Sequence, residues 1–464
     1  MWYPVFAGSK GMTDVRRPMG PLVVHPTNPR YFANSATGEV VYLTGSHTWA
    51  NLQERLPEGG EPFDYPKYLD FLKEHGHNFI RMWHWEHASD FSGQEPMAYE
   101  PSAFMRPGPG EALDGRPRFD VTRVSKGYMD RLRKRVLDAR DRGIYVSVML
   151  FQGFSVEKKG DAAGDPWRGH PFHKDNNVNG INGDPFETGH GREVHTAAIL
   201  PILDVQSDYV RHVVAAVADL DNVLFEIANE SHGGSTKWQY RMIDLVREAE
   251  SDRPMRHPVG MTVQWCPDDP GTNAALFESA AEWVSPNPEG PDGLNYRHDP
   301  PTADGSKVVL ADTDHLWGVP PAEEAETVRK WVWRSFLRGL QPIFMDPYRD
   351  ARLGKAPDAV WDPVRRAMGA TLTWAKQVDL ARTTPQGDLA STGYCLADDG
   401  REYLIYQPEG GRFSARLPAG TYRAAWYDCS RAEQSPPRKV RAPGGGVRLA
   451  PPFEGDVLLH LKAV

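Results

Sequence analysis

The feature that most constrains the fold is a regular alternation of short apolar runs with amphipathic stretches of helical period. The apolar runs are rich in Val, Ile, Leu and aromatic residues and end in polar residues, which is typical of buried parallel strands. Eight strand–helix repeats predict an α/β fold, the (β/α)8 TIM barrel. We expect strands at residues 40–45, 78–86, 143–151, 222–228, 258–264, 283–285, 307–315 and 342–346, and helices at 65–75, 126–141, 205–220, 237–249, 323–340 and 363–378.

The pattern changes after about residue 382. Short alternating segments separated by Gly, Pro and Asp turns follow, which predicts a small antiparallel β-sandwich. At 464 residues the chain is long enough for both parts. We therefore expect a barrel domain at residues 1–382 and a β-sandwich domain at 383–464. The sandwich either packs against the barrel, which we favour, or binds sugars independently.

Charge and composition exclude several classes of partner. The net charge is -9 and the pI about 6.0, whereas binding to nucleic acid or to an anionic membrane needs clustered Lys and Arg. The 14 Trp residues supply flat apolar surfaces on which sugars stack. We expect a neutral substrate, with no nucleic acid and no membrane as partner.

The cysteines and the opening residues bear on compartment and cofactors. Cys266, Cys395 and Cys429 are odd in number and widely spaced, so neither a disulfide framework nor a zinc motif is indicated. Residues 1–13 lack the pattern of a signal peptide, and no apolar run is long enough to span a membrane. We expect a cytoplasmic protein without a cofactor or bound metal.

The most informative motif is Asn229-Glu230, directly after the apolar run at 222–228. In a (β/α)8 barrel the carboxyl ends of all strands meet at one rim, so Glu230 would face the residues that end the other strands. Glycoside cleavage needs a proton donor beside the glycosidic oxygen, which Glu230 could be, and a second carboxylate on a facing strand. Asp312 and Asp314 both qualify as that second carboxylate. They share parity, so both could point inward with Asp314 one layer higher, and the choice between them stays open.

Other polar or aromatic residues at predicted strand ends are candidates for substrate binding. Arg81 would also keep the nucleophile ionised, because a nearby guanidinium lowers a carboxylate pKa. His170 and His173 could bind a metal with His190 or His195, although contacts to sugar hydroxyls fit their irregular context better. The candidate substrate-binding residues are His47, Arg81, Trp83, His84, Glu86, Asn229, Gln264, His315, Trp317 and Asp346.

These motifs resemble the apiosidase-like, cellulase-like branch of the clan A glycoside hydrolases, barrels followed by a β-sandwich that is sometimes given a collagen-binding label. The stretches that carry the resemblance are residues 209–230, 312–318, 342–348 and 387–395. The resemblance implies retaining hydrolysis of an O-glycosidic bond, with Glu230 as acid/base. The chain departs from it at strand seven, where it has Asp and the clan usually has Glu.

The expected function is therefore that of a retaining glycosidase that removes terminal sugars from a plant or microbial glycan or oligosaccharide, with the long segment at 152–200 as one wall of a pocket. Two alternatives remain. An inverting glycosidase would have its carboxyls roughly 6.5 to 9.5 Å apart, instead of about 5 to 5.5 Å. A barrel without catalytic activity would only bind carbohydrate.

Overall fold

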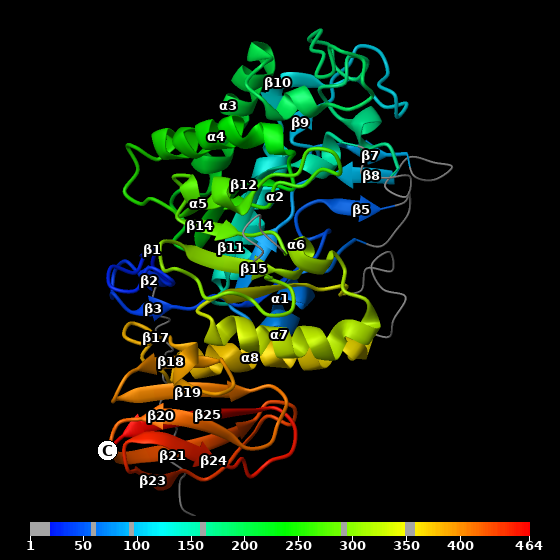
Figure 1. The fold of residues 1–464 in the computed structure, drawn as a ribbon. Coiled ribbons are helices and arrows are strands. Elements are labelled where there is room, and N and C mark those ends of the chain that lie inside the picture. Colours follow the sequence, from blue (N-terminus) through cyan, green and yellow to red (C-terminus); the bar gives the residue numbers. More distant parts are fainter. Residues whose placement is uncertain (1–18, 57–61, 92–96, 158–163, 289–294, 349–357) are drawn as a thin grey trace, which may run out of the picture.

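The computed structural model describes residues 19–56, 62–91, 97–157, 164–288, 295–348 and 358–464 (Figure 1). Residues 1–13, to which the expectation about a signal peptide refers, lie outside these ranges. Within them, no helix is both long and apolar enough to cross a membrane.

Eight parallel strands form a closed barrel, which confirms the predicted fold. Strand β16 pairs with β4, and β4 pairs with β6, so the first and last strands close the sheet. The longest barrel strands, β11 and β12, are buried along their whole length, as expected for a parallel sheet covered by helices. In chain order the barrel strands are β4 (Gly45–His47), β6 (Phe79–Met82), β11 (Tyr145–Gln152), β12 (Val223–Asn229), β13 (Val259–Thr262), β14 (Trp283–Ser285), β15 (Val308–Asp312) and β16 (Gln341–Met345).

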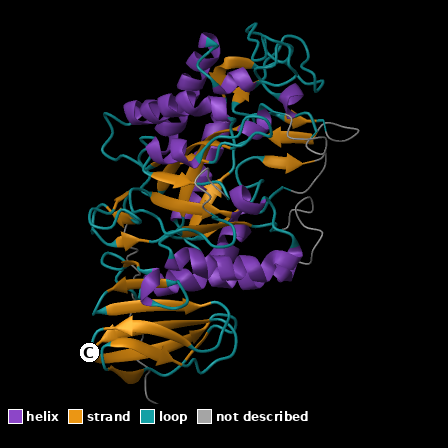
Figure 2. Cartoon of the chain, viewed as in Figure 1, coloured by secondary structure: helices purple, strands orange, loops and turns teal. Residues whose placement is uncertain are grey.

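Helices pack around the barrel (Figure 2), and the longer ones bury mostly apolar residues. They are α1 (Tyr65–Glu74), α2 (Lys126–Arg140), α3 (Leu200–Val217), α4 (Thr236–Ala249), α5 (Asn273–Glu278), α6 (Thr313–Trp317), α7 (Ala325–Leu337) and α8 (Asp362–Ala375). Short sheets are added to this core: β1 (Leu22–Val24), β2 (Phe32–Asn34) and β3 (Val40–Val41); β5 (Glu54–Leu56), β7 (Ser89–Asp90) and β8 (Met97–Glu100); and β9 (Phe104–Met105) with β10 (Asp120–Val124).

The structure corrects three details of the predicted barrel. Residues 40–41 belong to β3, which pairs with β2, and the first barrel strand is β4 instead. The described residues between β14 and β15 contain no helix, so one of the eight repeats is incomplete there. The seventh strand ends at Asp312, and Asp314 and His315 lie on the short helix α6.

Two glycines let the barrel strands approach closely. A Cβ on Gly45 would lie 1.8 Å from the carbonyl oxygen of Phe79, and a Cβ on Gly260 would lie 1.8 Å from the ring of Trp283. No side chain fits at either position, so glycine is required for β4 to lie beside β6 and for Trp283 to fill the barrel interior.

The C-terminal part is antiparallel, as predicted. One sheet contains β17 (Thr384–Pro385), β18 (Cys395–Asp398), β19 (Glu402–Gln407), β21 (Gly420–Asp428), β22 (Glu433–Gln434), β23 (Arg438–Ala442) and β25 (Val457–Ala463), and a second contains β20 (Phe413–Leu417) and β24 (Gly445–Leu449). Helices α7 and α8 lie between the barrel strands and these sheets (Figure 1). We propose residues 1–382 and 383–464 as the two domains, with the boundary between α8 and β17.

A buried ion pair joins α7 to the C-terminal sheet. Both nitrogens at the end of the Arg329 side chain bind Asp456, at 2.7 and 3.0 Å, and the Tyr406 hydroxyl donates to the same carboxylate at 2.8 Å. Arg329 and Asp456 are each 3% exposed. Removal of one partner of such a pair leaves a buried charge without compensation.

We expect Asp456→Asn to destabilise the protein by about 3 kcal/mol, the lower end of the range for a broken buried pair, because Glu326 still contacts Arg329. The measurement is the midpoint of thermal unfolding. The control is Glu409→Gln, which removes exposed ion pairs with Lys330 and Arg334 at the same boundary and should have little effect. Equal effects of the two variants would contradict the importance of the buried pair.

Candidate active site

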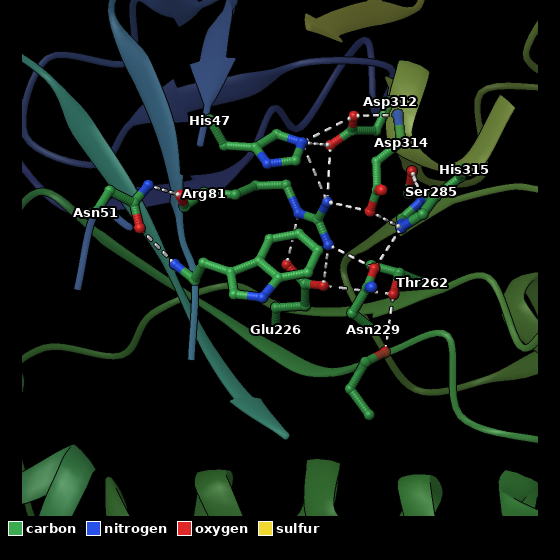
Figure 3. A network of polar contacts seen from close by, with 12 residues as sticks. His47, Asn51, Arg81, Glu226, Asn229, Thr262, Ser285, Asp312, Asp314 and His315 are labelled. Atoms are coloured by element: carbon green, nitrogen blue, oxygen red, sulfur yellow. Dashed lines mark hydrogen bonds and ion pairs between the residues drawn. The ribbon is translucent and has the colours of Figure 1, made fainter. Parts of the chain in front are cut away.

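Arg81 is the centre of a polar cluster inside the mouth of the barrel (Figure 3). It reaches from β6, and its guanidinium binds acidic side chains from two other strands and from α6. Nε and Nη2 donate to Glu226 at 3.0 and 2.5 Å, and Nη1 donates to Asp312 at 2.9 Å and to Asp314 at 3.4 Å. Its side chain is 3% exposed, so these partners compensate for the loss of hydration of the guanidinium.

Asp312, the last residue of β15, is held from three sides. His47 Nε2 lies 3.1 Å from its carboxylate, Arg81 donates to Oδ2, and the Asp314 backbone N–H donates to Oδ1 at 2.9 Å. Burial disfavours the Asp312 anion, but the charges of His47 and Arg81 outweigh burial and lower its pKa. Asp312 is therefore ionised, both of its carboxylate oxygens are engaged by these groups, and the residue is only 1% exposed.

Asp314 has a different environment although it is only two residues away. It lies on α6 and is 9% exposed, and its contact with Arg81 is long. Burial is the largest influence on it and the negative charge of Glu230 the next, and together they raise the pKa of Asp314 well above its usual range against the opposing charge of Arg81. The carboxyls of Asp314 and Glu230 thus lie within electrostatic reach of each other.

Glu230 follows β12 and has a backbone φ of 50°, in the left-handed region that non-glycine residues rarely adopt. Its backbone N–H donates to the Val263 carbonyl oxygen at 3.1 Å, which fixes it beside the end of β13. Such strain persists only where the surroundings hold it, and it is concentrated at functional sites.

Asn229 joins the cluster to α6. Its Oδ1 accepts from Arg81 Nη2 at 2.8 Å and lies 2.6 Å from His315 Nε2. The other ring nitrogen of His315 lies 2.8 Å from the Ser285 hydroxyl at the end of β14. Residues from three barrel strands and from α6 therefore determine the position of one amide group (Figure 3).

Of the residues predicted from the sequence, the structure brings together His47, Arg81, Asn229, Asp312, Asp314 and His315, with Glu230 beside Asp314. The Trp83 ring stacks on His47, with centroids 5.4 Å apart. Trp83 is only 3% exposed, so it offers no open face on which a sugar could stack.

Five predicted binding residues do not join this cluster, because other parts of the protein occupy their polar groups or rings. Asp346 is fully buried and bound by Arg365 of α8, at 2.5 and 2.8 Å. The His84 ring lies 2.8 Å from the Tyr128 hydroxyl, and Gln264 donates to Ser235 and Thr236 at the start of α4. Trp317 packs against Trp331 and His298, and Glu86 contacts His195, His170 and the Gln152 backbone.

The sequence reasoning missed three members of the cluster. Glu226 is bound by Arg81, and the Thr262 hydroxyl donates to the Ala228 carbonyl oxygen at 2.8 Å and faces Glu226 at 3.4 Å; Ser285 is the partner of His315. A detectable signal existed only for Glu226, since a carboxylate inside an otherwise apolar strand is rare unless it is paired.

No group of three His, Cys, Asp or Glu side chains with the geometry of a metal site occurs among the described residues. His170 and His195, considered above as ligands, both face Glu86.

The pKa values of Asp314 and Asp312 are shifted in opposite directions, so the pH dependence of stability can test the charge assigned to each. Folding raises the pKa of Asp314, so the native state binds more protons than the unfolded state, and stability falls as pH rises from about 4 through the folded pKa. We expect Asp314→Asn to raise the melting temperature at pH 8 but not at pH 4.

The matched control is Asp312→Asn, whose expected effect on stability has the opposite sign. Folding lowers the pKa of Asp312, so its anion contributes stability above the unfolded pKa, and that contribution is lost as pH falls through the folded pKa. Asp312→Asn should therefore destabilise the protein by a similar amount at pH 8 and at pH 4, and by less only as pH falls below about 4. Parallel effects of the two variants across this range would contradict the assignment of charge.

No family model matches the chain, and no curated protein matches it. Among solved structures it is similar to a glycoside hydrolase at 15% identity, over 96% of this chain and 97% of that one, with a TM-score of 0.60. It is also similar to a glycoside hydrolase family 5 protein from Bacteroides vulgatus at 14% identity, over 96% of this chain and 93% of that one, with a TM-score of 0.63. The chain therefore shares its fold, including the C-terminal antiparallel part, with solved glycoside hydrolases.

Proposed function

We propose that the chain is a retaining glycoside hydrolase in which Glu230 is the acid/base and Asp314 the nucleophile. The observation that carries the proposal is geometric. Glu230 directly follows β12, and Asp314 lies on α6 beside the buried Arg81, so both carboxyls stand at the mouth of one (β/α)8 barrel, within electrostatic reach of each other. The fold, shared with solved glycoside hydrolases, supports the same class of activity.

We prefer Asp314 to Asp312 as the nucleophile because the contacts of the Asp314 carboxylate are longer. The two oxygens of Asp312 are engaged by His47, Arg81 and a backbone N–H, so attack by either oxygen would break contacts that hold the cluster. Asp314 contacts Arg81 and His315 through Oδ2, at the longer distances of 3.4 and 3.7 Å. We assign Asp312 the role of orienting Arg81 and His47.

The proposed reaction has two displacements. A carboxylate oxygen of Asp314 attacks the anomeric carbon, the glycosidic C–O bond breaks, and the leaving oxygen takes the proton of Glu230. Water then gives a proton to Glu230 and attacks the anomeric carbon, which releases Asp314 as a carboxylate.

The proposed roles require a proton on Glu230 and an ionised Asp314. The raised pKa of Asp314 means that its anion is costly until Arg81 and the developing positive charge of the sugar compensate for it. The productive state has the proton on Glu230 and Arg81 facing the Asp314 anion. Below the pKa of Asp314 the nucleophile is protonated, so we propose that activity falls as pH drops through this raised pKa.

We further propose removal of terminal sugars. The segment at 152–200 reaches the residues after Glu230, since Arg192 contributes a carbonyl oxygen 3.1 Å from His232 Nε2 and its guanidinium binds Asp268. A wall on this side favours a pocket over an open cleft. Oligosaccharides as the first products from a polysaccharide would overturn this part of the proposal.

A panel of aryl glycosides that includes pentosides and furanosides tests the function on wild type, Glu230→Gln, Asp312→Asn and Asp314→Asn. Turnover by the wild type that falls sharply in the Glu230 and Asp314 variants supports the proposal. Binding of sugars without turnover would favour the carbohydrate-binding barrel. An inverted product would favour the inverting alternative.

A further inference from the structure

The turn that carries Glu230 is held by parts of the chain that do not belong to the Arg81 cluster. Gly153, just after β11, packs directly on it, and a Cβ there would lie 2.1 Å from the Glu230 carbonyl oxygen. The Gly233 backbone N–H donates to the Asp269 carbonyl oxygen at 2.7 Å. A strained φ at Glu230 needs support of this kind, because the residue would otherwise relax to an extended or helical backbone.

A buried chain of three side chains completes this support. The Ser231 hydroxyl, adjacent to Glu230, lies 2.9 Å from His195 Nδ1, and His195 Nε2 lies 2.9 Å from Glu86 Oε1. Ser231 and His195 are fully buried, and the imidazole stacks on Trp238 with centroids 4.5 Å apart and an interplanar angle of 14°. The ring can therefore neither turn nor move away from Ser231.

The chemistry fixes the direction of these hydrogen bonds. Glu86 accepts the Gln152 backbone N–H at 2.8 Å and lies 3.5 Å from His170 Nε2. Burial opposes ionisation of Glu86, but His195 and His170 outweigh it and lower the pKa of Glu86, so this carboxylate accepts from His195 Nε2–H. In the neutral ring Nδ1 is then an acceptor, and the Ser231 hydroxyl donates to it.

We propose that His195 is a positioning residue for Glu230, acting through Ser231 and oriented by Glu86. The proposal rests on the proposed function, since it concerns the placement of the acid/base. Three elements converge on the turn: the 3-10 turn Arg192–His195, the end of β11, and the segment after β13. The histidine that the sequence offered as a metal ligand thereby acquires a role in catalysis without touching substrate.

The consequence is specific to proton donation. If the turn relaxes, the Glu230 carboxyl moves from the glycosidic oxygen, while Asp314 and the Arg81 cluster stay in place. A displacement of about 1 Å can cost about 10²-fold in rate. The loss should be large for substrates whose leaving group needs protonation and small for those whose leaving group is already a stable anion.

The test compares His195→Ala with His257→Ala on two aryl glycosides of the same sugar, one with a dinitrophenol and one with an unsubstituted phenol as leaving group. His257 is a matched control, since it is also buried and bound to a carboxylate, Glu250, at 2.6 Å, but lies near the start of β12, where its Nε2 is 2.8 Å from the Leu220 carbonyl oxygen. We expect kcat/KM of His195→Ala to fall about 10²-fold on the phenyl glycoside and less than about 3-fold on the dinitrophenyl glycoside. His257→Ala should affect both substrates equally.

Ser231→Ala removes only a hydroxyl and keeps the test informative if His195→Ala does not fold; it should show the same difference between substrates. Equal losses on both substrates in either variant would overturn the proposal and leave a structural role only. Glu230→Gln distinguishes a failure of the positioning role of His195 from a failure of the proposed function. If it spares the dinitrophenyl substrate while the His195 and Ser231 variants do not, the positioning role fails and the proposed function stands.

Discussion

Asp314→Ala is expected to lose about 10⁴-fold or more in kcat on every glycoside that the wild type cleaves, because removal of a nucleophile abolishes the covalent route. Added azide should restore part of the turnover, since the cavity left by the carboxylate admits a small anion. Azide would attack from the face that Asp314 occupied, so the glycosyl azide formed should have the anomeric configuration opposite to that of the substrate. Product analysis by NMR measures this outcome.

Asp312→Ala is the control for this experiment. It should also lose activity, because Asp312 holds Arg81 and His47, but azide cannot replace a carboxylate that never reaches the substrate. Rescue of the Asp312 variant, with none in the Asp314 variant, would reverse the assignment made here. Asp312 ends β15 and Asp314 lies two residues later on α6, so this pair of variants answers the question that the sequence leaves open.

The fold could be read from the sequence because its signals are local. A buried parallel strand such as β12 is apolar along its whole length, and the following helix begins within a few residues. The first strand was misplaced because residues 40–45 are as apolar as any strand, while the barrel itself uses Gly45–His47, which is nearly featureless in sequence. Only the pairing of Gly45 with Phe79 shows why β4 must lie there.

The site was predicted less completely, because the end of a strand does not reveal which way a side chain points. Asp346 follows β16 just as Asp312 ends β15, yet it turns outward to Arg365. Asp314 was expected on the strand and lies on α6, because Asp312 accepts the Asp314 N–H and starts a helix there. The carboxylate of Glu226 inside an apolar strand indicated that it must be paired, but nothing in the sequence identified Arg81, 145 positions earlier, as its partner.

Arg81 contacts three acidic side chains, and it does not contact them equally. Glu226 and Asp312 take the short contacts with Arg81, and Asp314 has only a long one. The buried positive charge is therefore largely neutralised before it acts on Asp314, and the pKa of Asp314 stays high. An arginine bound to Asp314 alone would keep the nucleophile ionised but would also stabilise the ground state. Under the proposed roles, sharing Arg81 among three acids leaves the Asp314 anion to be stabilised partly by the positive charge that develops on the sugar in the transition state.

Glu230→Ala should lose about 10²- to 10⁴-fold in kcat/KM on phenyl glycosides, because general acid catalysis contributes about that much when the leaving group is a poor anion. On dinitrophenyl glycosides the first displacement needs no proton, so kcat/KM should change by less than about tenfold. The second displacement then lacks its base, and the glycosylated enzyme should accumulate, with a burst of dinitrophenol as the visible sign.

Azide should again increase turnover, but here it replaces water in the second step and yields a glycosyl azide with the configuration of the substrate. The opposite stereochemistry of the azide products from the Glu230 and Asp314 variants is the sharpest expectation of the proposed roles, because two carboxyls on opposite faces of the anomeric carbon must give opposite products. The same configuration from both variants would mean that the two residues do not flank the reacting carbon.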